Sequence, residues 1–161
     1  MKHALGLVLG LLFLAGCETT KMQQMLFVEQ EFDAYSAKGT GRIIGEAFAK
    51  TKGGDVKLAA GLPVILVPRT AYTEERFQFM MRGEDPPPAD PGLRRYMRQS
   101  IANSQGKFGF RDLPPGEYLV YCRVTWQMPS GWETGGYLLA RVRVAEGKTV
   151  GPVILRSGKA L

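Results

Sequence analysis

The sequence predicts an all-β domain, in the form of a seven-stranded β-sandwich with a short helical insertion. Apolar residues alternate with polar ones along residues 107–113 and again along residues 116–124, which is the period of a half-buried strand. Glycine and proline contribute 20 and 10 of the 161 residues, and they divide the apolar segments at short intervals, as turns between strands do. No long segment has the 3.6-residue period of an amphipathic helix. These three observations favour short strands over helices.

The first sixteen residues have the composition of an export signal. A short basic start is followed by an apolar run from Ala4 to Leu14, which is too short to span a bilayer as a helix. The run ends in Leu14-Ala15-Gly16-Cys17, which resembles the lipobox of bacterial lipoproteins. The resemblance implies that residues 1–16 are removed as a signal peptide and that Cys17 receives diacylglyceryl and fatty acyl chains such as palmitate. An ordinary secretory signal with an incidental cysteine is the alternative.

The lipid chains would place the protein on a membrane of the bacterial cell envelope, because two or three acyl chains hold a protein there stably. In lipoproteins an aspartate after the cysteine tends to retain the protein in the inner membrane, and here that residue is Glu18. The resemblance therefore implies an outer-membrane lipoprotein that faces the periplasm.

A tether is expected to span residues 17–38. Its apolar residues fit one face of a short helix and a strand almost equally well, and Val28 and Phe32 belong to both patterns. Two interpretations follow. The apolar end of the tether docks onto the domain, or the segment lies on the membrane as a helix.

The domain itself is expected over residues 39–157. Pro63 favours an edge position or a strand start for the second strand, because proline cannot donate a ladder hydrogen bond. The strands are predicted over residues 39–49, 58–68, 95–102, 107–113, 118–126, 137–144 and 150–155, with a hairpin loop over residues 128–136.

An insertion over residues 70–101 interrupts the strands. A threonine, two glutamates and three apolar residues at helical spacing predict a short helix over residues 72–83, and a proline-rich surface loop follows over residues 84–91. The insertion is either a binding surface or a lid over one open end of the sandwich.

The central feature of the domain is a corner between two strands. Pro114-Pro115-Gly116 turns the chain between a segment with alternating phenylalanines and the strand that begins near Tyr118. The motif resembles the signature of carboxypeptidase regulatory-like domains, which are small transthyretin-like sandwiches. The resemblance covers residues 39–155 apart from the insertion and implies an immunoglobulin/transthyretin-like arrangement of seven strands in two sheets. The matching residues are Asn103 to Gly106, Phe108, Phe110 and Leu113 to Tyr118.

Two absences limit the chemistry. The only histidine, His3, lies in the signal, so the mature chain has no Ser-His-Asp or Cys-His site and no metal bound through histidine. Apart from Cys17 the only cysteine is Cys122, which is predicted to pack in the core, and no intramolecular disulfide is expected. We therefore expect no enzyme, no catalytic residue, no cofactor and no metal. The acidic residues of the insertion have no nucleophile arranged around them: Glu74, Glu75, Glu84, Asp85 and Asp90.

The formal net charge of +6 comes from basic residues that are scattered along the chain. The densest group is Arg94, Arg95 and Arg98, which either forms a solvated surface or attracts anionic lipid, lipopolysaccharide or peptidoglycan carboxylates. Nucleic acid is not an expected partner, because the chain carries an export signal and has no basic stripe with interleaved aromatic residues.

Three aromatic residues, Trp126, Trp132 and Tyr137, are expected around one loop. Trp126 is assigned to closing the end of the sandwich. Trp132, flanked by glycine and serine, is the candidate ligand contact, because an exposed indole can stack on a sugar ring.

Two functions follow from these observations. The first is a non-catalytic, membrane-anchored lipoprotein whose β-domain serves as a binding or structural module at the cell envelope, with an envelope protein or glycan as partner. The alternative is a carbohydrate-binding module for peptidoglycan or a surface glycan, which depends on Trp132 and the arginines.

Overall fold

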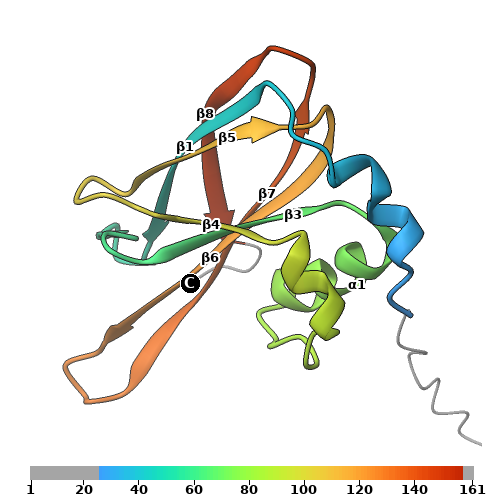
Figure 1. Cartoon of the computed structure of the whole chain (residues 1–161). Helices are drawn as coiled ribbons and strands as arrows, with labels where there is room; N and C mark the ends of the chain where they lie inside the picture. Colours follow the sequence, from blue (N-terminus) through green and yellow to red (C-terminus); the bar gives the residue numbers. More distant parts are fainter. Residues whose placement is uncertain (1–25, 158–161) are drawn as a thin grey trace, which may run out of the picture.

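The computed structural model describes residues 26–157. The predicted signal peptide and Cys17 therefore lie outside the described residues. In chain order the elements are η1 (Glu29–Tyr35), β1 (Gly41–Lys50), β2 (Val56–Leu58), β3 (Pro63–Pro68), α1 (Ala71–Met81), η2 (Pro91–Arg95), β4 (Arg98–Ile101), β5 (Lys107–Leu113), β6 (Gly116–Gln127), β7 (Glu133–Val144) and β8 (Thr149–Ser157), where η marks a 3-10 helix (Figure 1).

The strands form one strongly curled sheet, which confirms the all-β class (Figure 1). Seven strands follow the order β2-β1-β8-β7-β6-β3-β4, and β5 pairs with β1. The β1–β8 pair is parallel, whereas the other strand pairs are antiparallel.

The prediction of seven strands is wrong by one, since residues 26–157 contain eight. The predicted strand over residues 58–68 is divided by a turn, in which the Leu62 amide donates to the Ala59 carbonyl at 3.0 Å. The turn carries the chain from one side of the sheet to the other, because β2 pairs with β1 and β3 pairs with β6. Pro63 begins β3, as one of its two interpretations predicted.

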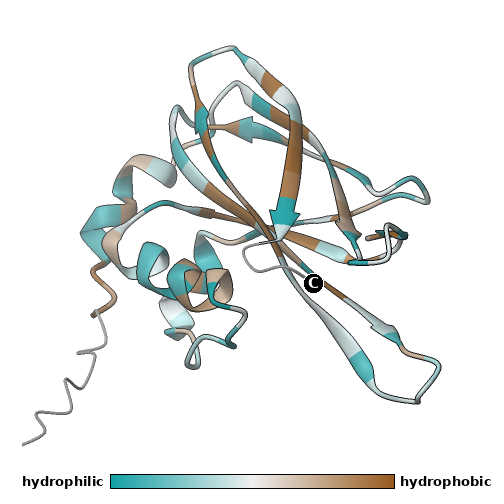
Figure 2. Ribbon diagram, turned by 180° about the vertical axis from the view of Figure 1, so that it is seen from behind, coloured by the Kyte–Doolittle hydropathy of each residue, from teal (hydrophilic) through white to brown (hydrophobic). Residues whose placement is uncertain are grey.

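The predicted corner is present, and β5 and β6 lie on opposite sides of the curl. β5 pairs with β1, whereas β6 pairs with β3 and β7. Apolar and polar residues alternate along the strands, so each strand turns one face into the curl (Figure 2). The main core fills this interior and includes Phe108, Phe110, Leu113, Val120 and Cys122, as predicted. Burial raises the pKa of the Cys122 thiol to about 11.

Helix α1 lies on the outer face of the sheet and does not cover an open end. Its Phe77 and Met80 pack with Val67, Leu119 and Leu139 of β3, β6 and β7. The helix begins one residue earlier than predicted, and its N-cap is Thr70. Thr73 is buried, and its hydroxyl donates to the Pro68 carbonyl at 2.6 Å.

The two ends of the curl meet at β4 and β5. The guanidinium of Arg98 donates to the backbone carbonyls of Arg111 and Asp112 at 3.0 and 3.2 Å, and the Gly109 amide donates to Ser100 Oγ at 3.4 Å. Side chains therefore hold these edges together in place of a strand ladder.

Residues 26–38 of the predicted tether dock onto the domain. Phe32 is fully buried and packs with Tyr72 and Leu93, and Phe27 stacks on it with ring centroids 5.0 Å apart. Tyr35 reaches the corner, where its hydroxyl exchanges two hydrogen bonds with the backbone of Glu117. None of the helices in the described part is long and apolar enough to cross a membrane.

Candidate functional site

A groove of about 560 Å³ lies between two hairpins of the sheet. One wall is the β1–β2 hairpin and the other is the β6–β7 hairpin. Both project toward the left in Figure 1, away from the docked tether on the right. We call this feature the hairpin groove. Its lining residues are Thr51, Lys52, Gly53, Asp55, Lys57, Trp126, Gln127, Met128, Pro129 and Thr134.

Trp126 forms the aromatic part of the groove. It lies near the end of β6, on the face that carries Val120, Cys122 and Val124, and it pairs with Thr134 across the hairpin. Its half-buried ring packs against the main core and also borders the groove. The ring of Trp126 therefore has two surfaces. One packs against the core at the end of the fold, as predicted, and the other borders the groove and is open to a ligand.

The opposite wall supplies polar and charged groups. Lys57 pairs with Ala49, which is buried, so Lys57 turns toward the interior of the curl. The turn before it is fixed by the Thr51 amide, which donates to the Asp55 carbonyl at 2.9 Å, and by the Asp55 amide, which donates to Thr51 Oγ1 at 3.1 Å. Among residues 26–157, Lys52, Asp55 and Lys57 form no ion pair, so their charged ends are available to a ligand.

An aromatic ring bordered by hydroxyl, carboxylate and ammonium groups suits a ligand with both apolar and hydroxylated faces. The ring can stack on the C–H face of a sugar, and the polar groups can bond its hydroxyls. The groove volume also falls in the range of about 300–1,000 Å³ for small-ligand sites. These groups can bind and orient such a ligand.

The three aromatic residues predicted around one loop are separated in the structure. The hairpin continues further than predicted, so its loop spans only residues 128–132. Tyr137 pairs with Arg123 on the outer face, whereas Trp126 faces inward. Trp132 lies in the loop with 77% of its surface exposed, outside the lining of the hairpin groove. Its role as a ligand contact stays a prediction.

A second hollow, of about 290 Å³, lies on the outer face of the same hairpin. Asp85 accepts hydrogen bonds there from the Tyr137 hydroxyl at 2.6 Å and from Arg123 at 2.9 Å. The bond from Tyr137 and the charge of Arg123 lower the pKa of Asp85, while burial and the Asp85 contact raise the pKa of Tyr137 to about 12. Asp85 and Arg123 neutralise each other, so this hollow has fewer unpaired charged groups for a ligand than the hairpin groove has.

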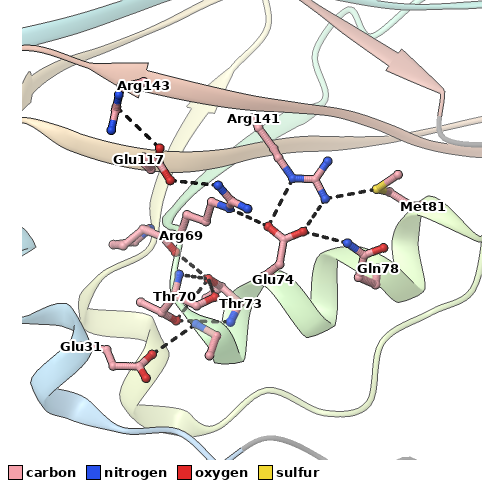
Figure 3. Close-up of polar contacts among 12 residues, drawn as sticks. Glu31, Arg69, Thr70, Thr73, Glu74, Gln78, Met81, Glu117, Arg141 and Arg143 are labelled. Carbon is pink, nitrogen blue, oxygen red and sulfur yellow. Dashed lines mark hydrogen bonds and ion pairs between the residues drawn. The ribbon is translucent and has the colours of Figure 1, made fainter.

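The acidic residues of the insertion are engaged in structural contacts. Glu74 lies between Arg141 and Arg69 and also accepts from Gln78 (Figure 3). These hydrogen bonds, that from Arg141 first, lower the pKa of Glu74 to about 2. Such a carboxylate stays ionised at neutral pH, which does not suit a general acid. Glu84 pairs with Arg82 and Asp90 caps η2.

The dense arginine group is divided among different contacts. Arg95 pairs with Glu29 of η1 at 2.9 Å, and Arg98 closes the curl as described above. Arg94 is exposed. The described part of the chain contains no group of three or more histidine, cysteine, aspartate or glutamate side chains arranged to hold a metal ion.

Sequence reasoning proposed Trp132 as the ligand contact and did not identify the groove residues Lys57, Asp55 and Thr134. These residues are close together because β1 and β6 face each other across the curl. No local sequence pattern near residues 51–57 or 126–134 predicts that the two strands face each other. The placement of Trp126 at the end of a predicted strand was the signal that the sequence offered.

Comparison with solved structures finds a similar fold. The chain resembles a protein from Pseudomonas aeruginosa whose crystal structure is described as that of a "putative carbohydrate binding protein". The two share 26% sequence identity with a TM-score of 0.71, and the similarity covers 81% of this chain and 97% of the other. No family model and no curated protein matches the chain.

Proposed function

We propose that the protein is a non-catalytic binding protein of the bacterial cell envelope and that its hairpin groove holds a carbohydrate. The observation that carries this proposal is the groove itself, in which Trp126 borders a space flanked by Asp55, Lys57 and Thr134. The likeness to the Pseudomonas protein supports the same class of ligand. Peptidoglycan and surface glycans are the carbohydrates that a protein of the envelope would meet.

The location follows from the N-terminal sequence. Residues 1–16 are proposed to be a signal peptide and Cys17 the lipidated anchor, with the protein on the outer membrane and facing the periplasm. The docking of residues 26–38 supports a short connection between anchor and domain. The hairpin groove then lies at the end of the domain away from the tether (Figure 1).

The finer fold type is proposed to be an immunoglobulin/transthyretin-like sandwich of the carboxypeptidase regulatory-like kind. In support, the main core lies between the β1–β5–β8 side and the β3–β6–β7 side of the curled sheet. The Tyr118 hydroxyl donates to the Pro114 carbonyl at 2.8 Å. A tyrosine that bonds back to the backbone at a corner is a feature of such sandwiches.

A protein partner is the second candidate, and the edge of the sheet favours it. Among the strands of residues 26–157, β2 pairs only with β1, and its Val56 and Leu58 are about half exposed, at 56% and 45%. An unpaired edge with exposed apolar side chains can accept a strand from another chain. The protein would then serve as a structural module of an envelope assembly.

Tryptophan fluorescence tests the carbohydrate proposal, because the chain has only Trp126 and Trp132. A chain that begins at Thr19 retains every helix and strand that the structure describes. In its Trp132→Phe variant, the emission reports Trp126 alone. Titration with peptidoglycan fragments and with neutral oligosaccharides is expected to give a saturable shift for at least one of them.

Two further variants locate the site. Trp126→Ala is expected to abolish binding, which is measured by isothermal titration calorimetry because this variant lacks the fluorescent reporter. Because this ring also packs on the core, the exposed Asp55→Ala variant provides a second reading and should weaken binding about tenfold, the loss of one hydrogen bond to a charged group. Trp132→Ala is the matched control and should bind as the parent does. Binding lost in Trp132→Ala alone would move the site to the hairpin loop, and no shift with any sugar would reject the carbohydrate and favour a protein partner.

A further inference from the structure

Two groups of cations in the described chain differ in their ion pairing. On the α1 side of the sheet, arginines are paired with carboxylates: Arg69, Arg82, Arg123, Arg141 and Arg143 all form ion pairs. On the outer face of β1, β5 and β8, five cations form no ion pair with any residue in 26–157. These are Arg42 and Lys50 of β1, Lys107 and Arg111 of β5, and Arg156 of β8.

Strand register places these cations on one face, which we call the basic face. In β1 the buried residues Ile43, Ala47 and Ala49 alternate with outward Arg42 and Lys50. β5 alternates in the same way, with Phe108 and Phe110 inward and Lys107 and Arg111 outward, and Leu155 of β8 is buried beside Arg156. Glu46 of β1 lies on the same face, and its register partner is Lys107. The face therefore carries an excess of positive charge.

Exposed aliphatic side chains lie on the same face. Ile44 projects between Arg42 and Glu46 with 50% of its surface exposed. Val56 and Leu58 of β2 pair with Lys50 and Phe48, which puts them on the outer side as well, and they are 56% and 45% exposed. Aliphatic groups surrounded by unpaired cations are characteristic of surfaces that lie on anionic lipid, since the cations attract the head groups and the apolar groups enter the interface.

We infer that the basic face binds the anionic surface of a phospholipid bilayer. The charge is complementary to anionic head groups, and it is spread over the three neighbouring strands β5, β1 and β8. The basic face is distinct from the hairpin groove, since none of its five cations lines that groove. Lipid binding by this face would fix how the domain rests on a membrane, independently of any covalent anchor.

Vesicle co-sedimentation tests the inference with the unlipidated chain that begins at Thr19. Vesicles of phosphatidylcholine alone are compared with vesicles that contain phosphatidylcholine and phosphatidylglycerol at 7:3. Binding is expected only to the anionic vesicles and should fall as salt is raised from low to high concentration. Neutralising Arg42, Lys107 and Arg111 together with glutamine should weaken it about fivefold per cation, or about 100-fold in all.

The matched control carries the same change in net charge at another place. Arg82, Arg94 and Arg143 are exposed, and Arg82 and Arg143 belong to the α1 side. Their replacement by glutamine should leave most of the vesicle binding intact. Ile44→Gln is expected to reduce the binding that persists at high salt, because it removes an apolar contact and no charge. Thermal unfolding of each variant checks that the fold is kept.

Three outcomes would overturn the inference. If the two triple variants lose vesicle binding equally, then the net charge of the protein, and not the position of the cations, determines the binding. Equal binding to neutral and anionic vesicles would remove the role of the cations. Binding to a soluble acidic polysaccharide such as polygalacturonate, with none to vesicles, would assign the basic face to a polymer. Each outcome can be told apart from failure of the carbohydrate proposal, which is read from Trp126 in the absence of lipid.

Discussion

Asp112 adopts a conformation that few residues accept. It is the one non-glycine residue in 26–157 with a positive φ, at +56°. It lies where β5 bulges against β1, since the register moves from Gly41 opposite Leu113 to Ile43 opposite Phe110. Aspartate enters the left-handed region more readily than most L-residues, and glycine does so at still lower cost. Asp112 therefore shapes the bulge at the start of the corner.

Substitutions of Asp112 should distinguish the effect of its backbone conformation on stability from the effect of its charge. Asp112→Gly is expected to unfold at the same urea concentration as the parent or higher, whereas Asp112→Ala should lose about 1 kcal/mol because alanine resists a positive φ. Asp112→Asn keeps the conformation and removes the exposed contact with Lys38 at 3.9 Å, so it should be nearly neutral. If Asn and Ala variants lose equal stability, charge and not backbone conformation is what matters there.

At the scale of the elements, α1 is fixed to the sheet by a network of charged side chains as well as by its apolar face. Glu74 of α1 bonds to Arg141 of β7 and Arg69 after β3, and Arg69 also pairs with Glu117 of β6 at 2.9 Å (Figure 3). Arg141 lies over the ring of Phe77, 4.8 Å from its centroid. The helix is thereby linked to three strands.

Glu74→Gln should lower stability in a pH-dependent way. The pKa of Glu74 is near 2 in the folded chain and near its ordinary value of 4.5 when unfolded. Its contribution is therefore fully present above about pH 4.5 and is lost as pH falls toward 2. We expect the variant to lose about 1 kcal/mol at pH 7, and urea unfolding at a series of pH values should show the gap closing below pH 4.5. A gap that stays constant down to pH 2.5 would contradict this account.

The elements that the sequence could predict are those with a strong local signal. The alternation of apolar and polar residues over 107–113 and 116–124 identified β5 and β6, and helical spacing identified α1. The break between β2 and β3 was missed, because Ala59 to Leu62 continues the apolar run although it forms a turn. The helical face of α1 also gave no indication of which side of the sheet it would cover, since that depends on contacts with Leu119 and Leu139, which are distant in sequence. The hairpin groove was unpredictable for the same reason.

At the scale of the whole molecule, the docked tether determines how the domain is attached. Phe32 is fully buried between η2 and α1, and Tyr35 packs over the corner. A side chain on Gly116 would meet the Tyr35 ring at 2.5 Å, so the corner is shaped to receive it. If Cys17 carries the lipid, only the residues from 17 to 26 separate the membrane from the docked segment, a reach of about 30 Å at most.

Phe32→Ala should release this segment. Loss of a buried phenylalanine costs about 3 kcal/mol or more, which corresponds to about a 100-fold larger population of the undocked form. Trypsin should then cleave after Lys38 much faster than in the parent, as followed by mass spectrometry. Leu26→Ala is the matched control, because Leu26 is 83% exposed and its loss should leave the rate unchanged. Equal rates in the parent and the Phe32 variant would show that docking does not protect the segment.

The position of β8 in the sheet determines when, during synthesis, the domain can fold. Among the strands of residues 26–157, β8 is synthesised after the other seven, and it lies between β1 and β7, inside the strand order (Figure 1). Without it, β2, β1 and β5 are separated from β7, β6, β3 and β4, because β8 is the strand that joins the two groups by backbone hydrogen bonds. The domain therefore cannot close around its core until residues 149–157 have been synthesised, and a polypeptide cut short before residue 149 would be left with two open half-sheets, each with an unpaired edge that can aggregate.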